Sequence, residues 1–229
     1  MRTTKISHPQ PAPACGKNYA RGMTLIELLV VIVLVVILWG IAMPNPSGLQ
    51  TKGAEAKDLS NARQVGLGLR LYASDHNGKF PTSTKSANEA FRYIVPTYIP
   101  SQKIFYLPGS GWSTGSHPVE VSSSGTLAAG QNTYAYVSGL LDSDDTNYPL
   151  VADGFNAGAP GVYNSVQGTK GGVWKGKHAV VVRVDDSAAI EAVAGSDFRV
   201  YANGMNPARA DIFTTSAKWM PSGVVLTPE

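Results

Sequence analysis

The amino-acid sequence predicts an α+β fold, in which a long N-terminal α-helix packs on a C-terminal antiparallel β-sheet. The helix is predicted from an apolar run at residues 23–43 and from residues 52–75, where apolar side chains recur every three to four positions. The sheet is predicted from short runs in the second half that are rich in β-branched and aromatic residues and separated by turn residues. With 229 residues, of which 43% are hydrophobic, the chain can bury a sizeable core.

Residues 1–22 are interpreted as a basic leader peptide. They carry four of the 19 basic residues and no acidic one, so the remainder has 15 basic against 16 acidic residues. The net charge of +3 therefore reflects the leader, and no nucleic-acid partner is predicted. The only cysteine, Cys15, also lies in the leader, so no disulfide or cysteine-based metal site is expected after it.

Residues 23–43 are predicted to form a membrane-spanning helix. The run contains one charged residue, Glu27, and as a helix it would be about 31 Å long, close to the thickness of the bilayer core. A buried core helix would be shorter and less uniformly apolar. A secretory signal peptide is the stronger alternative, although Gly40 and Ala42 form only a mediocre cleavage site. The basic leader predicts a single-pass protein with a cytoplasmic N-terminus and an extracytoplasmic C-terminal domain.

Glu27 is the unusual residue of the apolar run. An ionised carboxylate in lipid costs several kcal/mol, so it is expected to pair with a positive group or to have a function. A free α-amino group at Met23 would be a suitable partner. That amine exists only if the chain is cut after Gly22.

The run at residues 21–31, Arg-Gly-Met-Thr-Leu-Ile-Glu-Leu-Leu-Val-Val, resembles the cleavage and methylation motif of type IV prepilins and of the pseudopilins of type II secretion. The resemblance implies that a prepilin peptidase cuts after Gly22 and methylates Met23, which stands where phenylalanine is usual. It also implies that Glu27 is the glutamate of the motif. In a dry core of packed helices, this carboxylate is expected to accept hydrogen bonds from the N-terminal amine of a neighbouring subunit and so to set the axial register between subunits. The implied partners are the peptidase, other pilin-like subunits and the assembly platform of the inner membrane.

By the same resemblance, the chain would be a structural subunit of a type II secretion pseudopilus or of a type IV pilus. The pseudopilus is favoured because the mature chain lacks the C-terminal cysteine pair of many pilins. A membrane-anchored extracytoplasmic enzyme or binding protein is one alternative. An adhesin or minor tip pilin is another, and its ligand would be expected at residues 110–130, which include Trp112.

Residues 44–79 are predicted to form an amphipathic stem helix, kinked near Pro44 and Pro46 because proline cannot continue a helix. Asn45 would cap the new helix, with Pro46 at its first position. Asn77 is expected to be part of the terminating turn, with Phe80 packed over the helix end. The apolar stripe is expected at Leu59, Ala62, Gly66, Leu69 and Tyr72 or Ala73, with Lys57, Asp58, Asn61, Arg63 and Arg70 mainly outside it.

Residues 80–229 are predicted to form the extracytoplasmic, β-rich globular domain. A short helix is expected at residues 87–95, and a long loop or irregular hairpin at 112–129. The predicted strands are residues 133–137, 149–154 and 179–184, the last forming a hairpin with 188–193. His178 before this hairpin and Asp185-Asp186 within it resemble a pattern of many prepilin-type proteins, where glycine would be expected in place of Asp186.

Chemistry-bearing motifs are sparse. Asp142, Asp144 and Asp145 alternate with other oxygen-bearing residues as a calcium loop requires, but the glycine and the distal glutamate of an EF-hand are missing. The segment is therefore interpreted as a solvated acidic turn, with calcium as the alternative. The histidines lack metal-ligand spacing, and there is no nucleophile elbow, phosphate-binding loop or dinucleotide motif. No cofactor and no enzymatic activity are predicted.

Overall fold

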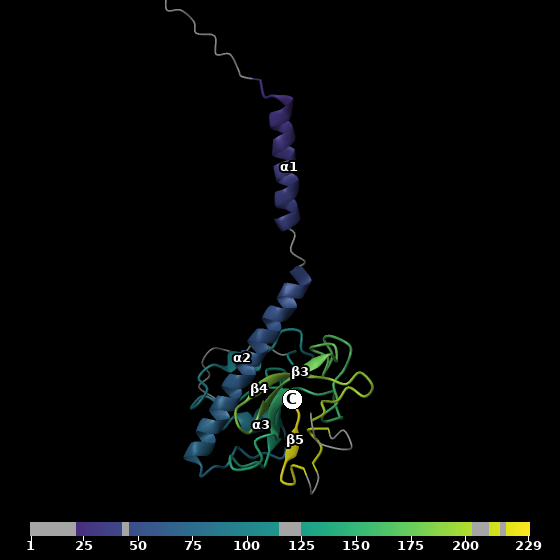
Figure 1. Ribbon diagram of the computed structural model, residues 1–229. Coiled ribbons are helices and arrows are strands. Elements are labelled where there is room, and N and C mark those ends of the chain that lie inside the picture. Colours follow the sequence, from purple (N-terminus) through teal and green to yellow (C-terminus); the bar gives the residue numbers. More distant parts are fainter. Residues whose placement is uncertain (1–21, 43–45, 115–124, 203–210, 216–218) are drawn as a thin grey trace, which may run out of the picture. The chain divides into compact units, whose positions relative to one another are not determined.

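The computed structural model describes residues 22–42, 46–114, 125–202, 211–215 and 219–229, and it gives no side-chain environment for residues 40–50 (Figure 1). The predicted α+β fold is confirmed in outline, since N-terminal helices precede an antiparallel sheet. The elements are α1 (Leu25–Ala42), α2 (Pro46–Asp75), α3 (Ala87–Phe91), the 3₁₀-helix η1 (Gln102–Phe105), β1 (Tyr134–Ser138), β2 (Pro149–Asp153), β3 (His178–Arg183), β4 (Ala188–Ala192) and β5 (Val224–Leu226).

The chain forms two units, residues 1–49 and 50–229, so most of the stem helix belongs to the same unit as the sheet. Helix α2 begins at Pro46, as predicted, because the fixed φ of proline suits the first helical position. The predicted cap Asn45 and the kink at Pro44 lie outside the described residues. Among the described helices, none is both long and apolar enough to cross a membrane.

The sheet has five strands in the order β4-β3-β2-β1-β5, and every neighbouring pair is antiparallel. The predicted strands are confirmed as β1 to β4, including the hairpin of β3 and β4. Asp186 in its turn has a φ of +67°, a left-handed conformation that favours glycine, which explains why glycine is expected there. Strand β5 was not predicted, because three residues, Val224–Leu226, carry too little pattern.

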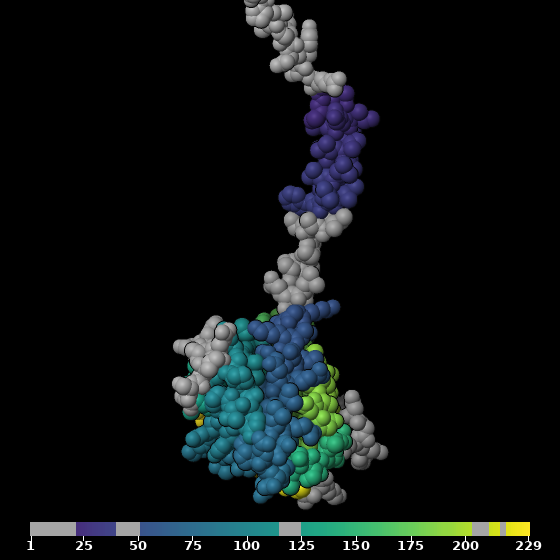
Figure 2. All heavy atoms as spheres, turned by 90° about the vertical axis from the view of Figure 1, so that its left-hand side faces the viewer, coloured from purple at the N-terminus to yellow at the C-terminus, as the bar shows by residue number. Residues whose placement is uncertain are grey.

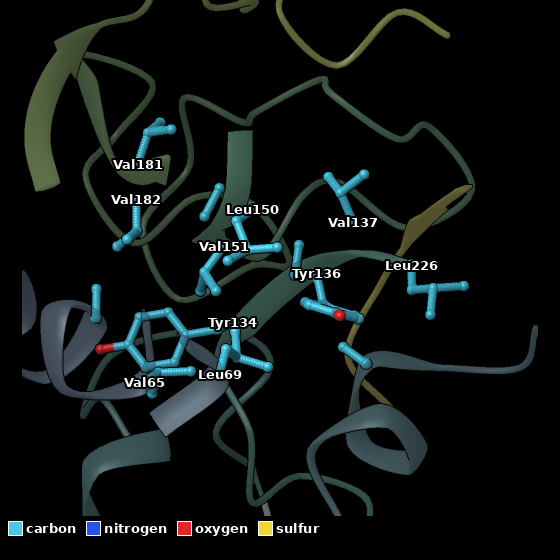
Figure 3. Packing of buried hydrophobic residues seen from close by; sticks show 14 of the residues in the cluster. Val65, Leu69, Tyr134, Tyr136, Val137, Leu150, Val151, Val181, Val182 and Leu226 are labelled. Atoms are coloured by element: carbon cyan, nitrogen blue, oxygen red, sulfur yellow. The ribbon is translucent and has the colours of Figure 1, made fainter. Parts of the chain in front are cut away.

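Side chains cover both faces of the sheet. In Figure 3, Val137, Leu150 and Val181 point to one side, where loops from the second half of the chain bring Met220 and aromatic side chains into the core. The opposite face carries Tyr134, Tyr136, Val151 and Val182, and α2 lies against it with Val65 and Leu69. Figure 2 shows α2 in blue, between the teal segment that follows it and the yellow-green end of the sheet.

The buried face of α2 differs from the predicted stripe. Ala62, Val65 and Leu69 are fully buried, but so is Asp58, and Asn61 is nearly so. Both polar residues were expected outside the apolar stripe. Conversely, two apolar residues of the same helix, Leu67 and Leu71, remain about half exposed. The helix therefore presents polar groups to the core near its middle, and these buried groups need hydrogen-bond partners there.

The end of α2 is as predicted. Asn77 and Gly78 both have positive φ, and the Gly78 amide donates to the carbonyl of Ala73 at 2.8 Å, which caps the last turn. Phe80 follows and is fully buried. The next helix, α3, is shorter than predicted. It ends at Phe91, and residues 92–98 continue it as hydrogen-bonded turns.

Candidate functional site

The motif residues lie at the start of α1. Gly22 and Met23 precede the helix, and both are exposed. A Cβ built at Gly22 would have no atom within 4 Å, so the fold itself has no steric need for glycine there. A requirement for glycine at this position would therefore come from a molecule that acts on the chain.

Thr24 caps α1, a role that sequence reasoning missed. Its Oγ1 accepts a hydrogen bond from the Glu27 amide at 3.3 Å, and its carbonyl accepts one from the Leu28 amide at 3.1 Å. The signal was present, because threonine followed three residues later by glutamate is a capping pattern. Glu27 thereby occupies the first turn of α1, where the helix dipole favours a carboxylate.

No described residue of its own unit covers the apolar surface of α1. From Leu25 to Trp39 the large apolar side chains are between 47% and 83% exposed. They lie all around the helix and not along one stripe. Such a surface is unfavourable in water, so it indicates that α1 is buried against other molecules or in lipid.

A cluster of buried, hydrogen-bonded polar side chains lies between α2 and the sheet. Asp58 of α2 and Asp153 of β2 are both fully buried. Asp58 accepts hydrogen bonds from the hydroxyl of Tyr134 at 2.7 Å and from Nε1 of Trp174 at 3.2 Å. Oδ2 of Asp153 accepts from the same Trp174 nitrogen at 2.9 Å and from the Val180 amide at 2.8 Å. We call Asp58 and Asp153 the acid pair.

The acid pair holds its protons more tightly than ordinary aspartates. Burial raises the pKa of Asp58, against the hydrogen bonds from Tyr134 and Trp174 that favour its charged form. Burial, and then the negative charge of Asp58, raise the pKa of Asp153 well above its usual 3.8. Oδ1 of Asp153 is buried and accepts from none of the described donors.

His178 lies at the outer side of this cluster. Its ring stacks on Trp174 with centroids 5.2 Å apart, and its Nε2 lies 3.4 Å from Oε1 of Glu55, without the geometry of a hydrogen bond. Burial lowers the pKa of His178, in spite of the nearby Glu55 carboxylate. The sequence showed His178 as an isolated histidine, and the structure brings it next to α2.

The calcium candidates occupy the loop between β1 and β2. Oδ2 of Asp144 accepts from the Leu141 amide at 2.8 Å, and Oδ1 of Asp145 accepts from the amide and side chain of Asn147 at 2.9 Å. The Asp142 amide donates to the carbonyl of Gly78. Within the described ranges, no three acidic, histidine or cysteine side chains gather as a metal would require. The loop is thus built as hydrogen-bonded turns, and calcium binding stays the untested alternative.

Trp112 does not offer the exposed aromatic surface that a ligand site would need. It is 5% exposed, its Nε1 donates to the carbonyl of Phe155 at 2.7 Å, and Lys170 Nζ lies 3.9 Å from its ring centroid. The part of the predicted loop at residues 115–124 lies outside the described residues. Trp112 is therefore a core residue, and the expectation of a ligand contact there is wrong.

Comparison with protein families identifies the N-terminal segment. Residues 17–43 match the family model of the prokaryotic N-terminal methylation motif. The match confirms the resemblance carried by Gly22, Met23 and Glu27 and supports a type IV prepilin-like protein, the class that includes the pseudopilins. It covers the leader end and α1, and not the globular unit. Neither the curated proteins nor the solved structures include a match to this chain.

Proposed function

We propose that the chain is a structural, pilin- or pseudopilin-like subunit that is processed before assembly. A prepilin peptidase removes residues 1–22 by cutting after Gly22 and then methylates the new N-terminus at Met23. The observation that carries this proposal is the methylation motif matched at residues 17–43, followed by a helix that begins at Leu25. The exposed, sterically unconstrained Gly22 supports a cut at this position.

In this proposal α1 is an anchor first and an assembly element later. Its apolar side chains, exposed on every side, require an apolar environment, which the inner membrane supplies before assembly. The basic leader keeps the N-terminus in the cytoplasm, so the globular unit is extracytoplasmic, in the periplasm or at the cell surface. In a filament, the helices of neighbouring subunits replace the lipid.

Glu27 is proposed to set the register between subunits. Its carboxylate accepts hydrogen bonds from the methylated amine at Met23 of a neighbour, which lies in the same apolar surroundings. A carboxylate left without a partner in such surroundings costs several kcal/mol, so registers that separate the two groups are rejected. The amine exists only after cleavage, which couples assembly to processing.

The assembly machine is proposed to be a type II secretion system, with a type IV pilus as the alternative. The preference rests on the resemblance and on the position of the only cysteine, Cys15, in the leader, which leaves the mature subunit without a disulfide. The subunit's partners in either machine are other pilin-like subunits and the inner-membrane assembly platform.

Mass spectrometry tests the processing step. The chain is produced with and without a prepilin peptidase, and the mature N-terminus is sequenced. We expect a methylated Met23 only with the peptidase, and an uncut chain for Gly22→Leu. Gly53→Ala is the matched control, because a Cβ at this glycine also meets no atom within 4 Å. A mature chain that starts at Met1, or one that starts close to Ala42, contradicts the proposal.

A cross-linking assay tests the register. Glu27→Leu should abolish subunit cross-links in membranes while leaving cleavage at Met23 intact. Thr24→Val is the control, because it removes the hydroxyl that caps α1 without touching the carboxylate. The register role is wrong if Glu27→Leu subunits cross-link as efficiently as wild type.

A further inference from the structure

The acid pair lies where the stem helix first meets the sheet. Asp58 is the first fully buried residue of α2 among those whose surroundings are described, and only Ala54 and Glu55 before it are half-buried. Tyr134 and Trp174, which donate to Asp58, come from β1 and from the segment just before β3. Tyr134 is visible in Figure 3, with its hydroxyl directed toward α2. These contacts therefore fasten the first buried turn of the stem to the globular unit.

The hydrogen bonds leave one position that a proton would fill. Both oxygens of Asp58 accept from side-chain donors, and Oδ2 of Asp153 accepts from two donors. Oδ1 of Asp153 has no donor among the described groups, while Oδ2 of each carboxyl accepts from the same Trp174 nitrogen, which makes the two carboxyls close neighbours. A proton held by the two carboxyls in common removes one of two like charges from the core.

No described cation compensates the pair. The described ion pairs join Lys85 to Glu89, His178 to Glu55, Arg183 to Glu191 and Arg199 to Asp211. Neither Asp58 nor Asp153 takes part in any of them. If both carboxyls ionised, two negative charges would therefore face each other in the core, where water cannot screen them.

Among the described residues, the groups around the acid pair are neutral or acidic, apart from His178 and the Lys177 that precedes it. These groups are Glu55 and Asn61 on α2, Tyr134 on β1, Tyr163 and Trp174 on the loops, and His178 and Val180 on β3. Lys177 lies near His178, where its charge, like burial, disfavours a protonated imidazole. The environment thus offers the acid pair no positive charge in place of the shared proton.

We propose that Asp58 and Asp153 form a proton-dependent clasp, which holds the first turns of α2 on the sheet while they share one proton and releases those turns when both ionise. Release would free residues 54–61 of the stem and lengthen the connection between α1 and the globular unit. The clasp does not depend on processing or assembly, so it can be tested separately from the proposed function.

Its pH dependence has a definite sign. The docked state binds the proton more tightly than the released state, so docking is complete at low pH and weakens as the pH rises. Between the ordinary aspartate pKa and the raised pKa of the pair, the released fraction should increase about tenfold per pH unit. Above the raised pKa the dependence should end.

Hydrogen exchange followed by mass spectrometry tests the clasp on the full-length chain in detergent. Exchange of residues 54–61 is measured across neutral and mildly acidic pH and is divided by the intrinsic chemical rate at each pH. We expect the ratio of the measured to the intrinsic exchange rate, which reports the opening equilibrium, to increase about tenfold per pH unit in this segment. Residues 65–73 of the same helix, held by apolar contacts, are the internal control and should show no such slope. A flat profile at residues 54–61 overturns the proposal.

Two amide variants test where the proton lies. Asp153→Asn keeps an oxygen for the Trp174 and Val180 donors, places its NH₂ group at the Oδ1 position and removes the charge, so it should keep residues 54–61 protected and abolish their pH dependence. Asp58→Asn turns its NH₂ group either toward Trp174 Nε1, which can only donate, or toward the Tyr134 hydroxyl, which must then stop donating to residue 58, so it should weaken protection of the segment at every pH. The clasp is refuted if Asp153→Asn retains the wild-type slope. The wild-type profile decides the question if either variant fails to fold.

Discussion

Replacing Leu69 by alanine tests whether the stem helix is anchored mainly by its buried side chains. Leu69 is a residue of α2 whose side chain is fully buried against the sheet, close to Tyr134 (Figure 3). Leu71 lies on the same helix but is 46% exposed. The same substitution at both positions removes the same atoms with the same change in helix propensity, so the difference isolates burial.

The magnitude follows from the packing. Truncation of a fully buried leucine to alanine costs about 2–5 kcal/mol, since the lost transfer energy is increased by the cavity left behind. For a unit of the size of residues 50–229, this corresponds to a melting temperature lowered by roughly 4–20 °C. Leu71→Ala should cost about 0.5 kcal/mol or less, because the exposed part of its side chain gains little from folding.

The assay is thermal and urea unfolding of the full-length chain in detergent, followed by near-ultraviolet circular dichroism, which reports the packing of aromatic side chains in the globular unit. We expect a large loss of stability for Leu69→Ala and a small one for Leu71→Ala, with the same dependence on urea. Equal losses for the two variants would show that α2 is not docked through the face that the structure buries.

Three further predictions concern the globular unit. Gly66→Ala should destabilise it relative to Gly53→Ala, because a Cβ at Gly66 would lie 2.7 Å from Val182, while Gly53 is open and gains only helix propensity; equal melting temperatures would contradict this. Calcium should leave the melting temperature unchanged, because no three acidic side chains gather as metal ligands within the described ranges; an increase that Asp144→Asn removes would establish a calcium site. Since burial lowers the pKa of His178, its stabilising contribution should be present above pH ~6.5 and lost as the pH falls through the lowered value. His178→Phe, which keeps a ring beside Trp174, should remove this loss when the urea midpoint of unfolding is measured as a function of pH. An unchanged pH dependence would refute the assignment of the loss to His178.

Much of the fold could be predicted because its signals are local. The start of α2 at Pro46, its end at Asn77 and Gly78, and the hairpin of β3 and β4 all follow from neighbouring residues. Turn and capping chemistry acts over a few positions, so a single sequence contains it. The short strand β5 could not be predicted, because its strand conformation depends on pairing with β1 across the sheet.

The sequence by itself was enough to recognise the prepilin-type motif of the N-terminal segment. Gly22, Met23 and Glu27 lie within the single segment, residues 17–43, that matches the methylation motif, and neighbouring residues alone carry this match. Only the tertiary structure showed that Asp58 is buried. In the sequence it resembles any surface aspartate of an amphipathic helix. Its partners Tyr134 and Trp174 are 76 and 116 residues away. Whether a carboxylate faces water or a buried donor depends on such distant contacts, which helical periodicity cannot encode.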